Sequence, residues 1–238
     1  MNVAILLAGG VGNRLGANIP KQFIKVMGRP VLAHTIDKFE KHEEIHKILI
    51  VCVESYLDQM KDFIREYDFH KVAWVTAGGA DFQRSVQNGV NFLKGKVAPD
   101  DVVLVHFGVS PFVEADIISD AIRVCKEKGN AISTTDFYVL SGLKEDDASS
   151  KTWIDRETIA CMNSPHAFQY QFIYDLYQEG EKTGAIREVE PHTTTLMYKL
   201  GKTIYFSKGS QTNIKITRKE DLDLFEGYLL LQEKRKNQ

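Results

Sequence analysis

Short apolar runs rich in β-branched residues alternate along the chain with amphipathic segments. The runs that have the length and composition of buried strands are Val3–Ala8, Lys47–Val53, Val72–Thr76, Val102–His106 and Ala131–Thr134. The segments between them that carry apolar residues at helical spacing are Pro30–His42, Tyr56–Tyr67, Asp81–Leu93 and Glu114–Lys128. This alternation predicts an α/β fold with a parallel central sheet flanked by helices on both faces. Ligands of such sheets bind at the carboxyl ends of the strands.

The regular pattern is interrupted between Asp136 and Gln169, where the chain is polar and rich in turn residues. Trp153 and two isoleucines in this stretch favour an ordered segment over a disordered loop. Such a segment could form an arm that packs on a partner. The pattern then resumes, with a helix expected over Phe172–Lys182, a strand over Thr203–Phe206 and a last helix that begins near Thr217 or Arg218. Without repeats or a linker, the 238 residues are predicted to form a single domain, 1–238, with the arm at about 136–169.

The bulk composition, with 43% hydrophobic residues, is that of an ordinary globular protein. A formal net charge of −2 argues against nucleic acid as a partner. No apolar run approaches the roughly 20 residues that span a bilayer, and the N-terminal run has no basic lead, so neither a membrane span nor a signal peptide is expected. The three cysteines are scattered and lack CxxC spacing, which predicts reduced thiols and a cytoplasmic protein.

The stretch "LLAGGVGNRLGANIPKQF", which follows the first predicted strand, is a glycine-rich loop of the kind that binds phosphate. A dinucleotide fingerprint fails here, because position 15 is leucine, Pro20 interrupts the required helix and Glu54 is too distant to bind a ribose. A P-loop fails as well, because the only Gly-Lys-Thr of the chain, at 201–203, lacks the earlier glycine. A nicotinamide oxidoreductase is therefore disfavoured.

The same loop carries two cations, Arg14 and Lys21, among backbone amides that glycine leaves accessible. A forked guanidinium and a point ammonium seven residues apart could hold one polyphosphate from two sides, as attack on a nucleoside triphosphate requires. The alternative is a surface turn with two solvated charges.

The motifs of this chain resemble those of the cytidylyltransferases that act on 2-C-methyl-D-erythritol 4-phosphate or ribitol 5-phosphate. The resemblance covers nearly the whole chain, and it rests on "LLAGGVGNRLGANIPKQF", "GGADFQRSV" at 78–86, "VLVHFGVSPF" at 103–112, "NSPHAF" at 163–168 and "NIKIT" at 213–217. It implies a Rossmann-like nucleotidyltransferase fold, with a mostly parallel sheet flanked by helices and a protruding arm that reaches across a homodimer. It also implies transfer of CMP from CTP to a phosphorylated polyol, with release of pyrophosphate and a CDP-alcohol.

The resemblance assigns roles to individual residues. Arg14, Lys21 and Lys215 are the implied catalytic cations, and Arg156, with Lys215, is implied to position the acceptor phosphate. The implied nucleotide-binding residues are Leu7, Ala8, Gly9, Gly10, Gly79, Ala80, Asp81 and Ser85. The alternatives without a functional role are a surface arginine at position 156 and an ordinary helix serine at position 85. Mg²⁺ is expected as a cofactor held mainly through the CTP phosphates, and no residue is assigned as a metal ligand.

The chain departs from the resembled pattern on the acceptor side. Phe107 stands where the family has Asp and Ser110 where it has Arg, while His166 replaces a Gln and Pro191-His192 replaces a Thr-Asp pair. His106 is interpreted as a packed histidine at a strand end. Two explanations compete: an active enzyme with a different acceptor, or a nucleotide-binding protein with a degenerate acceptor site and little turnover.

Overall fold

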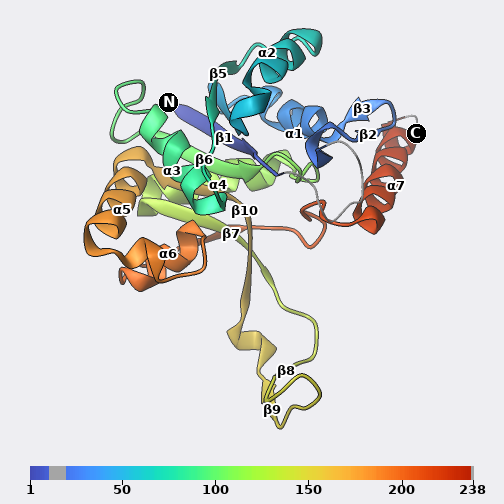
Figure 1. The fold of residues 1–238 in the computed structure, drawn as a ribbon. Helices are drawn as coiled ribbons and strands as arrows, with labels where there is room; N and C mark the ends of the chain where they lie inside the picture. The colour runs from blue at the N-terminus through green and yellow to red at the C-terminus, as the bar shows by residue number, and fades with distance from the viewer. Residues whose placement is uncertain (11–19, 237–238) are drawn as a thin grey trace.

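A computed structural model describes residues 1–10 and 20–236 of the chain, and a twisted central sheet runs through this part (Figure 1). The strands are β1 (Asn2–Ala8), β2 (Lys25–Val26), β3 (Arg29–Pro30), β4 (Lys47–Cys52), β5 (Val72–Ala77), β6 (Val102–Phe107), β7 (Asn130–Asp136), β8 (Ser141–Leu143), β9 (Thr152–Ile154), β10 (Ala160–Gln169) and β11 (Phe206–Lys208). The helices are α1 (Val31–Glu40), α2 (Leu57–Glu66), α3 (Phe82–Phe92), α4 (Ala115–Lys128), α5 (Tyr170–Thr183), α6 (Thr193–Lys199) and α7 (Lys219–Lys236). Single 3₁₀ turns form η2 (Lys21–Phe23), η3 (Glu54–Tyr56), η4 (Arg156–Thr158) and η5 (Ala185–Arg187).

The central sheet of the described residues has seven strands in the order β11-β7-β10-β6-β1-β4-β5. All neighbouring pairs are parallel except those of β10, which runs antiparallel to both β6 and β7. The predicted fold class, a mostly parallel sheet flanked by helices with a protruding arm, is confirmed. In the register of the sheet, Leu7 of β1 lies opposite Phe107 of β6, so the carboxyl ends of these two strands meet.

Two buried apolar layers enclose the sheet, and β1 contributes side chains to both. Ala4 and Leu6 belong to the layer under α1, α2 and α4, whereas Val3 and Ile5 belong to the layer under α3, α5 and α6. This follows from the pleat, which points successive side chains of a strand to opposite faces. Because both faces are covered, the strand is apolar at every position after Asn2, as the continuous hydrophobic run Val3–Ala8 indicated.

Helix α7 forms a smaller core of its own outside the sheet. Phe225 of α7 packs with Phe112, which follows β6, and with Ile216 of the segment that leads into α7. The Oδ2 atom of Asp221 accepts hydrogen bonds from the backbone amides of Thr217 and Arg218, which confirms the predicted start of the last helix. The C-terminal segment is thereby held against the carboxyl end of β6.

The arm is shorter than predicted. The sequence placed it at about 136–169, but residues 160–169 return into the sheet as β10, and residues 137–159, with the β8–β9 hairpin, project away from the body (Figure 1). Strand β10 was not predicted because it contains polar residues, which are typical of exposed segments. Ser164 and His166 are nevertheless buried in this strand, which lies between β6 and β7.

The strand predicted over Thr203–Phe206 is displaced, since β11 begins only at Phe206. The Asn130 side chain accounts for the difference: its Nδ2 donates to the carbonyl oxygen of Thr203, and its Oδ1 accepts from the amide of Tyr205. A side chain therefore replaces part of the strand ladder before β11. The β2–β3 hairpin and α6 were not predicted, because both are too short for a clear periodic signal.

Candidate functional site

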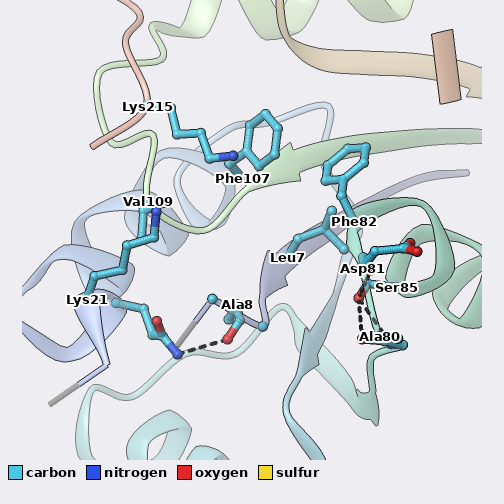
Figure 2. A pocket seen from close by; sticks show the side chains of 14 residues that line it. Leu7, Ala8, Lys21, Ala80, Asp81, Phe82, Ser85, Phe107, Val109 and Lys215 are labelled. Carbon is cyan, nitrogen blue, oxygen red and sulfur yellow. Dashed lines mark hydrogen bonds between the residues drawn. The ribbon is translucent and has the colours of Figure 1, made fainter. Parts of the chain in front are cut away.

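A pocket opens at the carboxyl ends of β1, β5 and β6, where the fold class predicts a ligand site (Figure 2). It brings together segments that are far apart in the sequence. The residues that line it are Leu7, Ala8, Gly9, Gly10, Lys21, Gln22, Gly79, Ala80, Asp81, Phe82, Ser85, Phe107, Val109 and Lys215. All the predicted nucleotide-binding residues are in this set, together with Lys21 and Lys215.

The turn η2 is attached to the end of β1 by a buried side chain. Gln22 is 1% exposed, and its Nε2 donates to the carbonyl oxygen of Ala8 at 2.9 Å. Lys21, its neighbour in the turn, is thereby held beside the backbone of residues 8–10, which line the same pocket. The sequence interpretation did not single out Gln22, although its position directly after Lys21 in the glycine-rich stretch was a usable signal.

The loop between β5 and α3 is folded around the hydroxyl of Ser85. The Ser85 Oγ donates to the carbonyl oxygen of Asp81 at 2.7 Å and accepts from the amide of Gly79 at 3.0 Å. The Asp81 carboxylate caps α3 by accepting from the amide of Arg84 at 2.7 Å. Ser85 and Asp81 therefore stabilise the local structure of the loop, and both residues also line the pocket.

Glycine is required at position 79 by the close approach of the first turn of α3. A Cβ built there would lie 2.3 Å from the Cβ of Arg84 and 2.8 Å from its carbonyl carbon. The second of these is a backbone atom, so the clash cannot be relieved by rotating a side chain. The loop therefore packs its own backbone against the helix that borders the pocket.

Lys21 and Lys215 reach the pocket from opposite ends of the chain. The Nζ of Lys21 donates to the carbonyl oxygen of Ile216 at 3.1 Å, and the amide of Ile216 donates to the carbonyl oxygen of Val109 at 2.8 Å. The Nζ of Lys215 lies 3.7 Å from the centroid of the Phe107 ring (Figure 2). The pocket thus contains two ammonium groups close to backbone amides, an arrangement suited to a polyanion.

One wall of the pocket is aromatic. Phe82 and Phe107 line it with ring centroids 5.0 Å apart, and the Phe82 ring centroid also lies 4.8 Å from that of His192. The sequence interpretation noted Phe107 as a departure from the resembled pattern but missed the role of Phe82. Its signal was the position of Phe82 directly after the glycine loop, in the first turn of α3.

The buried histidines and cysteines near the sheet are poorly suited to acid–base or nucleophilic chemistry. Burial lowers the pKa of His106 to about 4, and burial, with smaller contributions from His192 and His106, lowers the pKa of His166 to about 4. His106 Nε2 bonds to the carbonyl oxygen of Ser110, which confirms it as a packed histidine at a strand end. Burial raises the pKa of Cys52 to about 11, so this thiol stays protonated.

The two predicted arginines are not among the described residues of the pocket. Arg14 lies outside the described residues. Arg156 lies in η4 on the arm, where its Nη1 donates to the carbonyl oxygen of Tyr138 at 3.1 Å. The arm leads away from the body that holds the pocket of the same chain (Figure 1).

Within residues 1–10 and 20–236, no group of three or more His, Cys, Asp or Glu side chains could hold a metal ion. Asp81 supplies the carboxylate of the described lining, and one of its oxygens caps α3. No helix of the described residues has the length and apolar character needed to cross a membrane.

Comparison with known proteins gives matches along nearly the whole chain. Residues 2–230 match the family described as IspD, 2-C-methyl-D-erythritol 4-phosphate cytidylyltransferase. A ribitol-5-phosphate cytidylyltransferase of Lacticaseibacillus paracasei is 39% identical over 229 residues, which cover 96% of this chain and 98% of the relative. A 2-C-methyl-D-erythritol 4-phosphate cytidylyltransferase of Clostridium acetobutylicum is 35% identical, with coverage of 93% and 94%.

The solved structures give the same fold. The crystal structure of 4-diphosphocytidyl-2C-methyl-D-erythritol synthase from Anaerococcus prevotii superposes with a TM-score of 0.80 at 26% identity, and the match covers 97% of this chain and 96% of that one. The predicted Rossmann-like nucleotidyltransferase fold is therefore confirmed.

Proposed function

Because the chain belongs to the 2-C-methyl-D-erythritol 4-phosphate cytidylyltransferase family, we propose that it transfers CMP from CTP to a phosphorylated polyol and releases pyrophosphate and a CDP-alcohol. The acceptor is 2-C-methyl-D-erythritol 4-phosphate, ribitol 5-phosphate or a related compound, in line with the names of the relatives. The observation that carries the proposal is the meeting of Lys21 and Lys215 in one pocket with Gly9, Gly10 and the loop of Gly79, Ala80 and Asp81.

The proposed reaction is an in-line displacement at phosphorus. A phosphate oxygen of the acceptor attacks the α-phosphorus of CTP, a new P–O bond forms, and the bond to the bridging oxygen of the β-phosphate breaks. Both reactants are anions, so catalysis consists mainly of positioning them and stabilising the charge that grows on the phosphoryl oxygens. Lys21 and Lys215, with Arg14, are the cations proposed for that task.

Nucleotide binding is proposed for the backbone of residues 7–10 and for the loop formed by Gly79, Ala80 and Asp81, with the hydroxyl of Ser85. Polar groups of fixed direction discriminate between bases because a wrong base leaves them unpaired. The contacts of Ser85 with Gly79 and Asp81 support this role, because they fix the loop geometry before a nucleotide binds. Mg²⁺ is the proposed cofactor, held mainly by the triphosphate, and it would screen the charge between the reactants.

A homodimer is proposed in which the arm of one protomer contacts the pocket of its partner. Arg156 lies on the arm, outside the lining of its own pocket, so as an acceptor-binding residue it would act in the pocket of a second copy. The arm exposes large apolar side chains, including Leu140 at 87% and Trp153 at 75%, which favours contact with another protein surface. The free Cys52, Cys125 and Cys161 support a reducing, cytoplasmic setting.

The experiment that tests the function is an assay of pyrophosphate release with CTP and a panel of polyol phosphates. We expect turnover with at least one acceptor and, with Lys21→Ala, turnover that is lower by a factor of at least about 10². Base preference is measured in parallel by thermal shift with CTP, UTP, GTP and ATP. A larger stabilisation by ATP or GTP than by CTP would contradict the assignment.

A nucleotide-binding protein with little turnover remains the second candidate. It is favoured by Phe107, whose apolar ring lines the pocket where the resemblance predicts an aspartate, and by Ser110, which stands in place of an arginine. Tight CTP binding with silence across the whole acceptor panel would support this candidate against the first.

A further inference from the structure

Lys215, which lies in the C-terminal part of the chain, contacts Phe107 at the end of β6. The Nζ of Lys215 lies 3.7 Å from the ring centroid of Phe107, well inside the roughly 6 Å range of cation–π attraction (Figure 2). The negative face of the ring attracts the ammonium, and the attraction is directional because it requires the charge to lie over that face.

The Phe107 ring is supported by other parts of the fold. Its backbone ends β6, and its side chain packs on Phe82 of α3 at 5.0 Å between centroids. Phe82 in turn packs on His192 at 4.8 Å, and the His192 carbonyl oxygen accepts from the Nε2 of Gln83 at 3.2 Å. The ring that meets the ammonium is thus held by β6, α3 and the residue that precedes α6.

The backbone beside Lys215 is fixed as well. The peptide of Ile216 donates through its amide to Val109 and accepts through its carbonyl oxygen from Lys21. A lysine side chain has a long flexible stem, so a fixed backbone alone leaves the ammonium many positions. The ring face restricts those positions at the far end of the stem.

We propose that Phe107 is a positioning residue that holds the Lys215 ammonium at a defined place in the pocket. The ring has no ionisable group, so it orients the charge without neutralising it. The effect on turnover rests on the proposed function, whereas the positioning itself can be measured without any reaction.

The positioning is tested by NMR on protein labelled with ¹³C at the lysine ε-carbon. Protons over a ring face are shifted upfield, so we expect the Lys215 Hε signals, assigned by their loss in Lys215→Met, to lie upfield of those of the exposed Lys61. Phe107→Leu should abolish the shift and Phe107→Tyr should retain it. Lys96, whose Nζ lies 4.4 Å from the Phe92 ring centroid, is the internal control, and its signals should move only in Phe92→Leu.

The consequence for the reaction is tested by a double-mutant cycle on pyrophosphate release. Phe107→Leu is expected to lower kcat about fivefold, the size of a cation–π contact at a partly exposed site, with little change in the KM for CTP. In a Lys215→Met background the same change should have no further effect, because the ring acts through the lysine. Phe107→Tyr should recover most of the activity, and Phe92→Leu, outside the pocket, should leave it unchanged.

The outcomes separate the two proposals. Absence of an upfield Lys215 signal in the unaltered protein overturns the positioning role, even if the enzyme is active. An equal loss of kcat from Phe107→Leu with and without Lys215 overturns it as well. An upfield signal that disappears in Phe107→Leu supports it, even if no acceptor in the panel is turned over. That silence would count against the proposed function alone.

Discussion

Lys21 and Ile216 are 195 positions apart in the sequence, and the ammonium of the first donates to the carbonyl oxygen of the second at 3.1 Å. This bond links Lys21 in η2 to the carbonyl group of the residue that directly follows Lys215. The ammonium of one predicted catalytic lysine is therefore bonded to the backbone of the residue next to the other.

Replacement of Lys21 tests its electrostatic role. Lys21→Ala is expected to lower kcat by a factor on the order of 10² to 10³, the range found when one preorganised donor to a developing negative charge is removed. Pyrophosphate release at saturating CTP gives the measurement. Lys25→Ala, at an exposed position of β2, is the matched control and should retain full activity. Equal activity of both variants would remove Lys21 from the mechanism.

Replacement of Gly79 tests the close packing of the nucleotide loop. Gly79→Ala places a methyl group against the backbone of Arg84, so the loop must shift, and CTP affinity measured by calorimetry should fall at least about tenfold, as displaced polar groups lose their alignment. The matched change is Gly227→Ala in α7, where a Cβ has open space around it. That variant should bind CTP normally and gain up to about 1 kcal/mol in unfolding free energy from helix propensity. Unaltered CTP affinity in Gly79→Ala would show that this loop does not bind the nucleotide.

The buried histidines predict how stability depends on pH. Burial holds the pKa of His106 at about 4, below the ordinary value of 6.5, so the unfolded chain binds a proton more readily than the folded protein. Above pH 6.5, His106 does not make the free energy of unfolding depend on pH. As the pH drops from 6.5 toward about 4, the unfolded chain takes up the proton and the folded protein does not, so the free energy of unfolding falls. Aspartates whose pKa is lowered, such as Asp221, lose their contribution only below that window, because their ordinary value is 3.8, whereas Glu181, with an ordinary value of 4.5, begins to lose its contribution at the lower end of the window.

The measurement is urea unfolding of His106→Gln at two pH values. Between about pH 7 and about pH 5, the variant should lose less unfolding free energy than the parent, by on the order of 1–2 kcal/mol. Glutamine retains an amide that can donate to the carbonyl oxygen of Ser110, which the His106 ring contacts. His70→Gln, at an exposed position, is the control and should follow the parent. Identical pH dependence of parent and His106→Gln would refute the prediction.

The arm predicts a self-association surface. Leu140→Ser and Trp153→Ser each remove a large apolar side chain from its exposed tip region and should shift the protein from dimer toward monomer in sedimentation at micromolar concentration. Leu224→Ser, which removes an apolar side chain of 60% exposure from α7, is the control and should leave the sedimentation coefficient unchanged. A monomeric unaltered protein would exclude the proposed dimer.

Much of the fold was predictable because burial on both faces of a parallel sheet leaves a direct trace in the sequence. The strands β1, β4 and β6 are apolar except at Asn2, Lys47 and His106, and the helices around them carry apolar residues at helical spacing. Strand β10 left no such trace. It enters the sheet with Ser164 and His166 buried, and its partners β6 and β7 are distant in the chain, so only long-range pairing identifies it.

The candidate site divides in the same way. The residue types that could bind a polyphosphate were recognisable before folding is considered, because glycines and lysines around "LLAGGVGNRLGANIPKQF" and "NIKIT" carry that chemistry locally. The tertiary structure decided that Lys21 bonds to Ile216 and that the ammonium of Lys215 lies over the ring of Phe107. The physical reason is that a side chain's chemistry belongs to its own residue, whereas its position depends on packing between segments that the chain brings together only when it folds.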